Sequence, residues 1–278
     1  MPEKTPSYTP PLETRRLPLE KADILSQGSV LQGRYEIIRV LGIGGMGAVY
    51  QARDLRFSNV SRLCAVKEMF STAVDPRMRQ LALDNFSREA NILAALNHPS
   101  IPKIFDFFSE GQRVYLVLEF VDGHNLEAII ESSPDFLEEG LVAEWAVQIC
   151  DVLDYLHSQK PNPIIFRDLK PSNIMVTPQN WVMLVDFGIA KVFQVGEKGT
   201  MIGTEGYSPP EQYRGVAELR GDLYALGATL HHLLTKRDPR VDPPVTCHER
   251  PPRRSHPALS EGRESPRIRA GQPLLLRR

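Results

Sequence analysis

A stretch of ten residues between positions 164 and 173 limits the fold of this chain more than any other feature. Its letters are IIFRDLKPSN, and the tripeptide Asp186-Phe187-Gly188 follows at a short distance. A three-residue motif such as Asp-Phe-Gly arises often by chance, whereas the longer stretch with a second motif at this distance does not. Together they predict a site that combines two acids, a lysine and an amide.

Four side chains of these motifs have the chemistry that phosphoryl transfer requires. Asp168 can accept a hydroxyl proton, and Lys170 can neutralise negative charge on the moving phosphoryl group. Asn173 and Asp186 carry oxygen atoms that can hold Mg²⁺. Positioning and charge neutralisation supply most of the catalysis in that reaction. The spacing of these residues therefore indicates a phosphoryl-transfer site.

Length, charge and cysteine content set broad limits. The chain has 278 residues, enough for one large domain or for two lobes with a cleft between them. Its net charge of −1 gives no indication of a nucleic-acid partner. Cys64, Cys150 and Cys247 are too far apart for zinc-like spacing, and an odd count argues against a disulfide framework. We expect reduced cysteines in a cytoplasmic protein.

The sequence predicts no membrane span. No apolar run approaches the ~20 residues that cross a bilayer. Residues 1–20 are rich in proline and charge and contain no apolar signal core. This pattern is a second reason to expect a cytoplasmic location.

The two ends of the chain differ in composition from its middle. Residues 1–30 contain five prolines, and residues 236–278 contain eight prolines, eleven Lys or Arg and five Asp or Glu. Sequence of this kind, with few aromatic residues, cannot bury enough apolar surface to offset its ordering entropy. We therefore predict a flexible leader at 1–30 and a disordered basic tail at 236–278.

The middle of the chain predicts a sheet region followed by a helical region. One helix is expected at 80–96 within the sheet region, while 141–156 carries an apolar stripe at helical spacing. Residues 222–234 are apolar nearly all round, as is typical of a core helix. Five strands are expected, at 34–41, 48–53, 63–69, 103–108 and 114–119. The fold class is therefore α+β.

Residues 41–49 contain the pattern G-x-G-x-x-G, which alone is a weak signal. A dinucleotide-binding fingerprint would require a helix directly after the glycines, and a P-loop would require Gly-Lys-Ser or Gly-Lys-Thr at its end. Here a predicted strand follows, and the residue 20 positions beyond Gly47 is Lys67 rather than an acid. The pattern favours a hairpin whose glycines let the backbone close over phosphates.

These motifs resemble those of eukaryotic-type (Hanks-type) Ser/Thr protein kinases, most closely the bacterial branch, from about residue 34 to about residue 234. The resemblance implies a two-lobed protein-kinase-like fold. A small antiparallel-sheet lobe would span 31–119, and a mainly helical lobe lacking the family's last helices would span 120–235. It implies transfer of the ATP γ-phosphoryl group to protein Ser or Thr hydroxyls, with Mg²⁺ or alternatively Mn²⁺.

The resemblance implies an ATP site built mainly from the sheet lobe. Lys67 would contact the α- and β-phosphates and pair with Glu89. The backbone of Glu119 and Val121 would bind the adenine edge, and Leu118 would guard the rear of the pocket. The other ATP-binding residues would be the glycine-rich loop and the residues around the adenine ring: Leu41, Gly42, Ile43, Gly44, Gly45, Met46, Gly47, Ala48, Val49, Ala65 and Met175.

Roles in catalysis and regulation follow from the same resemblance. Arg167 would pair with a phosphate on the activation loop, and Thr200 lies four residues before Thr204, where that phosphate usually sits. Activation by phosphorylation at Thr200 is our hypothesis, with self-association for autophosphorylation as one route; an ordinary loop threonine is the alternative. The catalytic pair would be Asp168 and Lys170, and the metal ligands Asn173 and Asp186.

Some positions raise specific expectations. Phe166 stands where the family most often has His, and its ring can still pack against Phe187. Asp222 would anchor the backbone of the catalytic loop, residues 166–173. Glu211 stands in Ser-Pro-Pro-Glu where the family has Ala-Pro-Glu, and its usual arginine partner cannot be identified in this sequence.

Alternatives remain open for the tail and for the function. The tail is a frame-shifted or truncated end, a natural basic tail with its own role, or a segment that folds in an unusual way. The competing functions are a catalytically inactive ATP-binding scaffold and a non-enzymatic docking arm for acidic partners, whose binding would weaken with salt.

Overall fold

The structure is a computed structural model. It describes residues 24–44, 47–57, 59–70, 77, 87, 90–91, 93–111, 113–187, 203–215 and 218–242. The chain divides into two compact units at Pro244, and every described residue lies in the first. The predicted leader falls mostly, and the predicted tail almost entirely, outside the described residues.

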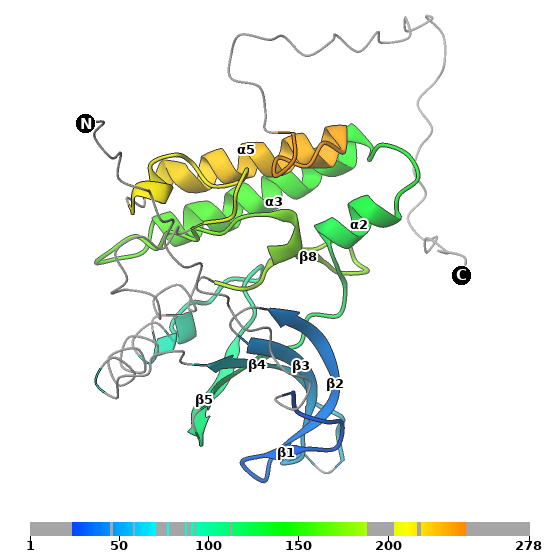
Figure 1. Cartoon of the computed structure of the whole chain (residues 1–278), viewed down its shortest axis with the longest axis vertical. Coiled ribbons are helices and arrows are strands. Elements are labelled where there is room, and N and C mark those ends of the chain that lie inside the picture. Colours follow the sequence, from blue (N-terminus) through cyan, green and yellow to red (C-terminus); the bar gives the residue numbers. More distant parts are fainter. Residues whose placement is uncertain are drawn as a thin grey trace, which may run out of the picture. The chain divides into compact units, whose positions relative to one another are not determined.

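Six antiparallel strands form the sheet lobe, in the spatial order β1-β2-β3-β4-β6-β5 (Figure 1). Their pairing confirms the small antiparallel sheet that alternation and β-branched residues predicted. The five expected strands all appear within a few residues of their predicted ends. The strands are β1 (Val30–Leu31), β2 (Tyr35–Gly44), β3 (Gly47–Asp54), β4 (Leu63–Phe70), β5 (Ile104–Glu110) and β6 (Arg113–Glu119).

Strand β6 is apolar on both faces because a cluster of side chains covers each side of it. Tyr115 and Val117 belong to the cluster that also contains Tyr35 and Tyr50. Val114 and Leu116 alternate with them and face the other cluster. The helix predicted at 80–96 lies largely outside the described residues, but its described positions 87, 90, 91, 93 and 94 are helical.

The helical lobe contains two long helices that pack side by side, α3 (Glu139–His157) and α5 (Leu219–Thr235) (Figure 1). A shorter helix, α2 (Leu126–Ser132), is capped by Asn125, whose side chain accepts a hydrogen bond of 2.8 Å from the Ala128 N–H. The smaller elements are β7 (His124–Asn125), η2 (Pro171–Asn173), β8 (Ile174–Val176), β9 (Val182–Leu184) and η3 (Gln212–Arg214).

Helix α3 confirms its predicted stripe, since Val142, Trp145 and Ile149 are among its buried residues. Helix α5 differs from expectation. One side is buried, but Leu223 is 56% exposed and Tyr224 is 45% exposed. An apolar pattern all round the helix therefore overstated its burial, because burial depends on what packs over each side. None of the helices in the described residues combines the length and apolarity needed to cross a bilayer.

Candidate active site

One buried carboxylate holds the main chain of the catalytic loop. Asp222, 1% exposed on α5, accepts main-chain hydrogen bonds from Phe166 (2.9 Å) and Arg167 (2.8 Å). The Nε2 atom of His157 lies 2.8 Å from the same carboxylate. The expected anchoring role of Asp222 is confirmed. An irregular loop held by a charged acceptor keeps its geometry without regular secondary structure.

Arg167 has a left-handed backbone, with φ of 68°. Such a conformation is uncommon for a residue other than glycine and is maintained by surrounding contacts. Two of these contacts are the Asp222 carboxylate at the Arg167 N–H and the Gln212 side chain at the Arg167 carbonyl. Thr200, the expected phosphate carrier, lies outside the described residues.

Asp168 lies at the centre of a hydrogen-bonded cluster and is 9% exposed. The Thr204 hydroxyl donates to Asp168 Oδ1 at 2.8 Å, and Lys170 Nζ donates to that hydroxyl at 2.9 Å. Lys170 Nζ also lies 3.4 Å from Asp168 Oδ2. The carboxylate thus already accepts a hydroxyl hydrogen bond, which is the contact that a general base needs.

Asn173 is oriented by the same acid. Its Nδ2 donates to the Asp168 carbonyl at 2.9 Å and to Asp168 Oδ2 at 3.1 Å. Because the nitrogen faces Asp168, the amide oxygen faces away from it. Asn173 is 6% exposed and lies on η2, two residues before Met175 on β8.

Lys67 forms an ion pair and hydrogen bond with Asp186, a residue 119 positions away. The Lys67 side chain is 15% exposed and that of Asp186 is 48% exposed. Glu89, the expected partner of Lys67, lies outside the described residues. The described contact therefore joins the lysine expected to bind phosphates to a predicted metal ligand.

Strand register brings the predicted adenine-side residues of the sheet lobe onto one face. Val49 pairs with Lys67 across β3 and β4, and Ala65 pairs with Leu118 across β4 and β6. Paired residues share a face, as do residues two apart along a strand. Val49, Ala65, Lys67 and Leu118 thus line the same side, while Met175 lies on β8 in the helical lobe.

The glycine-rich loop forms the β2–β3 hairpin, and its residues 41–44 are exposed. Gly47 has φ of 153°, and a Cβ there would lie 1.8 Å from the Glu68 carbonyl oxygen, so this position requires glycine. Ala48 is buried at the start of β3. Gly45 and Met46 lie outside the described residues.

Part of the segment expected to bind the adenine edge already forms hydrogen bonds within the protein. The Glu119 N–H donates to the Lys103 carbonyl at 2.8 Å, and the Lys103 N–H donates to Glu119 Oε2 at 3.2 Å. Of the Glu119 main chain, the carbonyl is therefore the group that can meet a ligand. Val121 follows two residues later, in an irregular segment after β6.

The Phe166 ring packs edge-on against Phe187, with centroids 5.0 Å apart and an interplanar angle of 77°. This confirms that an aromatic residue at position 166 retains the contact to the Asp-Phe-Gly motif. Phe187 also packs against the sheet-lobe cluster that contains Met69. It thus joins apolar clusters of the two lobes.

Several residues that hold the loop after position 203 were not identified from the sequence. Ser208 Oγ accepts from the Thr204 N–H at 3.0 Å, and the Tyr213 hydroxyl donates to the Thr204 carbonyl at 3.2 Å. Gln212 donates to the Arg167 carbonyl. Their proximity in sequence to Glu211 was the available signal. Glu211 itself forms no ion pair within the described part of the chain.

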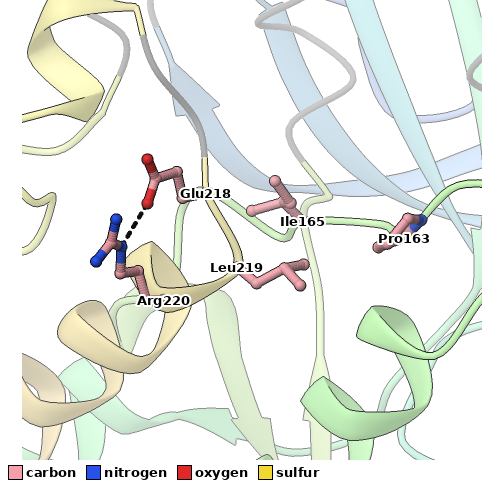
Figure 2. Close-up of a pocket in the computed structure, with 5 residues that line it drawn as sticks. All are labelled: Pro163, Ile165, Glu218, Leu219 and Arg220. Atoms are coloured by element: carbon pink, nitrogen blue, oxygen red, sulfur yellow. Dashed lines mark hydrogen bonds and ion pairs between the residues drawn. The ribbon is translucent and has the colours of Figure 1, made fainter.

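A cavity of 540 Å³ lies between the segment before the catalytic loop and the first turn of α5 (Figure 2). Figure 2 shows Glu218 paired with Arg220 at its edge. None of its lining residues is a predicted site residue, so the cavity is separate from the proposed chemistry. The lining residues are Pro163, Ile165, Glu218, Leu219 and Arg220.

Comparison with known proteins matches this chain to protein kinases. The protein kinase domain model matches residues 35–249. Serine/threonine-protein kinase B of a Synechocystis species is 36% identical over 224 residues, covering 76% of this chain and 38% of that protein. PknB of Mycobacterium tuberculosis is 38% identical over 251 residues, covering 84% of this chain and 38% of that protein. The chain thus spans well under half the length of these curated relatives.

Solved structures give the same result for the fold. The apo form of PpkA-294 superposes with a TM-score of 0.65 at 26% identity, covering 76% of this chain and 79% of that one. The kinase domain of M. tuberculosis PknI superposes with a TM-score of 0.59 at 27% identity, covering 82% and 83%. With the matched domain, the paired lobes and the clustered motif residues, the chain belongs to the protein kinase family, in its bacterial Hanks-type Ser/Thr branch.

Proposed function

We propose that this chain transfers the γ-phosphoryl group of ATP to Ser or Thr hydroxyls of proteins, with Asp168 as the base. The observation that carries the proposal is the cluster in which Asp168 accepts a hydroxyl hydrogen bond while Lys170 lies beside the same hydroxyl. A substrate hydroxyl that replaces Thr204 at Asp168 would meet the same acceptor. Lys170 would then neutralise charge on the phosphoryl group as it moves.

The residues of the site fit a divalent metal ion. The Asn173 amide oxygen faces away from Asp168, and the half-exposed Asp186 carboxylate is accessible. Both offer the hard oxygen atoms that Mg²⁺ or Mn²⁺ takes, usually together with phosphate and water oxygens. No group of three or more His, Cys, Asp or Glu is arranged for a metal within the described residues. When bound, the ion would neutralise phosphate charge and orient the phosphates.

ATP itself would be held from the sheet lobe. Lys67 would exchange part of its contact with Asp186 for the α- and β-phosphates, leaving Asp186 to the metal ion. The Glu119 carbonyl and the Val121 backbone would bind the adenine edge. Because the reaction consumes ATP, we place the domain in the cytoplasm.

A regulatory step at Thr200 belongs to the same proposal. A phosphate there would carry about two negative charges and would pair with Arg167, whose backbone N–H Asp222 already holds. Autophosphorylation between two copies is the proposed route. Phosphopeptide mapping of the fully active protein should find Thr200 modified, and a fully active protein with an unmodified Thr200 would contradict this step.

The direct test is phosphate incorporation measured by intact mass and by ATP turnover with Mg²⁺. We expect Asp168→Asn to lower turnover by about 10³-fold or more, since an amide cannot take up the hydroxyl proton and carries no charge. Asp154→Asn, at an exposed position on α3, is the matched control and should leave turnover unchanged. A wild-type chain that binds ATP without turnover would support the inactive scaffold instead.

A further inference from the structure

We infer that Gln212 is a positioning residue that holds the substrate-side loop, residues 203–208, against the catalytic loop. The inference rests on the proposed kinase activity for its effect on rate, and on hydrogen bonds of the described residues for its geometry. Gln212 begins η3 and is 4% exposed. A buried amide must satisfy its polar atoms within the protein, so its partners are fixed.

The Gln212 side chain connects two loops through one nitrogen. Its Nε2 donates to the Arg167 carbonyl at 2.8 Å and to Ser208 Oγ at 3.2 Å. A carboxamide nitrogen carries two hydrogens, so a single side chain can make both bonds at once. Arg167 and Gln212 are 45 positions apart in the sequence. The contact therefore ties the residue before Asp168 to the substrate-side loop.

From Ser208 the contacts continue to Thr204. Ser208 Oγ accepts from the Thr204 N–H at 3.0 Å, and the Ser208 N–H donates to the Thr204 carbonyl at 3.0 Å. These two bonds fix the main chain of Thr204 on both sides. The Thr204 hydroxyl in turn contacts Asp168 and Lys170. A displacement of the Gln212 amide would thus reach Asp168, the proposed base, through two residues.

Close packing leaves little room for this arrangement to shift. Gly203 has φ of 137°, and a Cβ at this position would lie 2.3 Å from Ser208 Oγ and 2.9 Å from Gln212 Nε2. Arg167, the other partner, has φ of 68°, and the Gln212 hydrogen bond to its carbonyl is one of the contacts that maintain it. The glycine and the left-handed arginine thus both lie next to the Gln212 amide.

Two substitutions of Gln212 separate hydrogen bonding from size. Gln212→Glu keeps the shape but presents carboxylate oxygens to the Arg167 carbonyl and removes both donors. Gln212→Met removes both donors without burying a charge. We expect each to lower kcat by about 10- to 100-fold, because a misplacement of about 1 Å in a reacting group can cost that much. The KM for ATP should change by less than about twofold, since Lys67 and Asp186 lie outside this chain of contacts.

Gln148→Glu is the matched control. Gln148 also donates through Nε2 to a main-chain carbonyl of the helical lobe, that of Asn180 at 3.2 Å, but it has no contact to the catalytic loop among the hydrogen bonds of the described residues. This variant should keep kcat within about twofold of wild type. A Gln212 variant that behaves like Gln148→Glu, or that raises the KM for ATP as much as it lowers kcat, would overturn the inference.

A double variant tests the route through Thr204. If Gln212 acts by positioning Thr204, then Gln212→Met should lower kcat by no more than about twofold further in a Thr204→Val background. Fully multiplicative losses would overturn this route. A variant that only reduced the amount of folded protein would multiply with Thr204→Val, so this readout separates positioning from general destabilisation.

Hydrogen exchange decides the geometric part without any need for activity. The amides of Thr204 and Ser208 should exchange at least about 10-fold faster in Gln212→Met than in wild type. In Gln148→Glu their exchange rates should equal those of wild type. Unchanged exchange in Gln212→Met would overturn the inference. A wild-type chain without turnover would refute the proposed function. The exchange rates would still test whether Gln212 holds residues 203–208 in place.

Discussion

Glu68 in the sheet lobe and Asp222 in the helical lobe are each 1% exposed, yet they bind different kinds of partner. Glu68 accepts from side chains, among them the Tyr50 hydroxyl at 2.5 Å and the Tyr115 hydroxyl at 3.1 Å, and it pairs with Arg113. Asp222 accepts from two main-chain N–H groups of the catalytic loop and has His157 as its one side-chain partner among the described residues. One buried acid therefore ties strands together, and the other fixes a functional loop.

This difference should affect which properties of the protein depend on each acid. Burial raises the pKa of the Tyr50 hydroxyl to about 12, with its hydrogen bond to Glu68 as the next cause. Tyr50 also accepts from the Leu25 N–H, so the Glu68 cluster reaches the segment before β1. The cluster stabilises β3, β4 and β6 as a unit, whereas Asp222 connects α5 to the residues beside Asp168. We expect stability to depend on both acids and catalysis to depend on one.

Of these two buried acids, Asp222 should give the larger effect when it is changed to Asn. This change places an amide nitrogen or a weaker oxygen against two main-chain donors and leaves a buried group unsatisfied. We expect kcat to fall by about 100-fold or more and the free energy of unfolding to fall by about 2–4 kcal/mol. Steady-state kinetics and urea unfolding measure the two quantities. Wild-type kcat in this variant would remove the distinction between the two acids.

Glu68→Gln is the counterpart in the sheet lobe. It keeps the volume but loses the charge that Arg113 and the two tyrosines share, so we expect the free energy of unfolding to fall by about 1–3 kcal/mol. The folded fraction should keep kcat within about threefold of wild type. The comparison fails if kcat per folded molecule falls as steeply as in Asp222→Asn.

A smaller effect should be a pH dependence of the free energy of unfolding that arises from a histidine of the helical lobe. The Tyr207 hydroxyl lies 2.6 Å from His232 Nδ1, and burial lowers the pKa of His232. As pH falls below about 6.5, the unfolded chain binds a proton at His232 before the folded chain does. The free energy of unfolding therefore decreases from its value above that pH until the pH reaches the lower pKa of the folded state. The surrounding charges have mixed signs: Asp238 and Glu127 are acidic, and Arg240 and His231 are basic.

We expect this proton to lower the free energy of unfolding by about 1 kcal/mol between pH 7.5 and pH 5.5. Thermal or urea unfolding at both values measures it. His232→Gln should remove this part of the pH dependence, and His124→Gln, at an exposed position, should keep it. An identical pH dependence in His232→Gln would contradict the assignment to His232.

The smallest perturbation is chemical labelling, which compares the lobes without a substitution. Cys64, 1% exposed on β4, has a pKa raised to about 11 by burial, while Cys150 on α3 is exposed. At pH 8 alkylation of Cys64 should be at least about 100-fold slower than that of Cys150, measured on separate peptides. Equal rates would show that the sheet lobe opens readily, so its buried cluster would not act as a unit.

Much of the fold follows from local pattern. The alternation in 34–41 predicted a strand because side chains of period two suit a sheet with a covered face. The stripe through Val142, Trp145 and Ile149 predicted α3 for the corresponding helical reason. Helix α5 was less well predicted, because its composition could not say which side another element would cover.

The site divides in the same way. The residue types at 164–173 and 186–187 identified the chemistry, because the residues of each set are close together in the sequence. The contacts between distant residues were inaccessible from pattern alone. Lys67 meets Asp186 across 119 positions, and Gln212 meets Arg167 across 45. Such pairs depend on how whole lobes pack.

The sequence by itself determined the chemical class of this protein, because phosphoryl transfer requires particular groups at short spacings. It also determined the places along the chain of five strands of the sheet lobe and of the two long helices α3 and α5, because periodicity is a local property of the chain. Only the tertiary structure decided which buried acid supports the catalytic loop and which amide joins that loop to residues 203–208. Those contacts exist because burial leaves each polar group a single set of partners, and burial is a property of the folded chain.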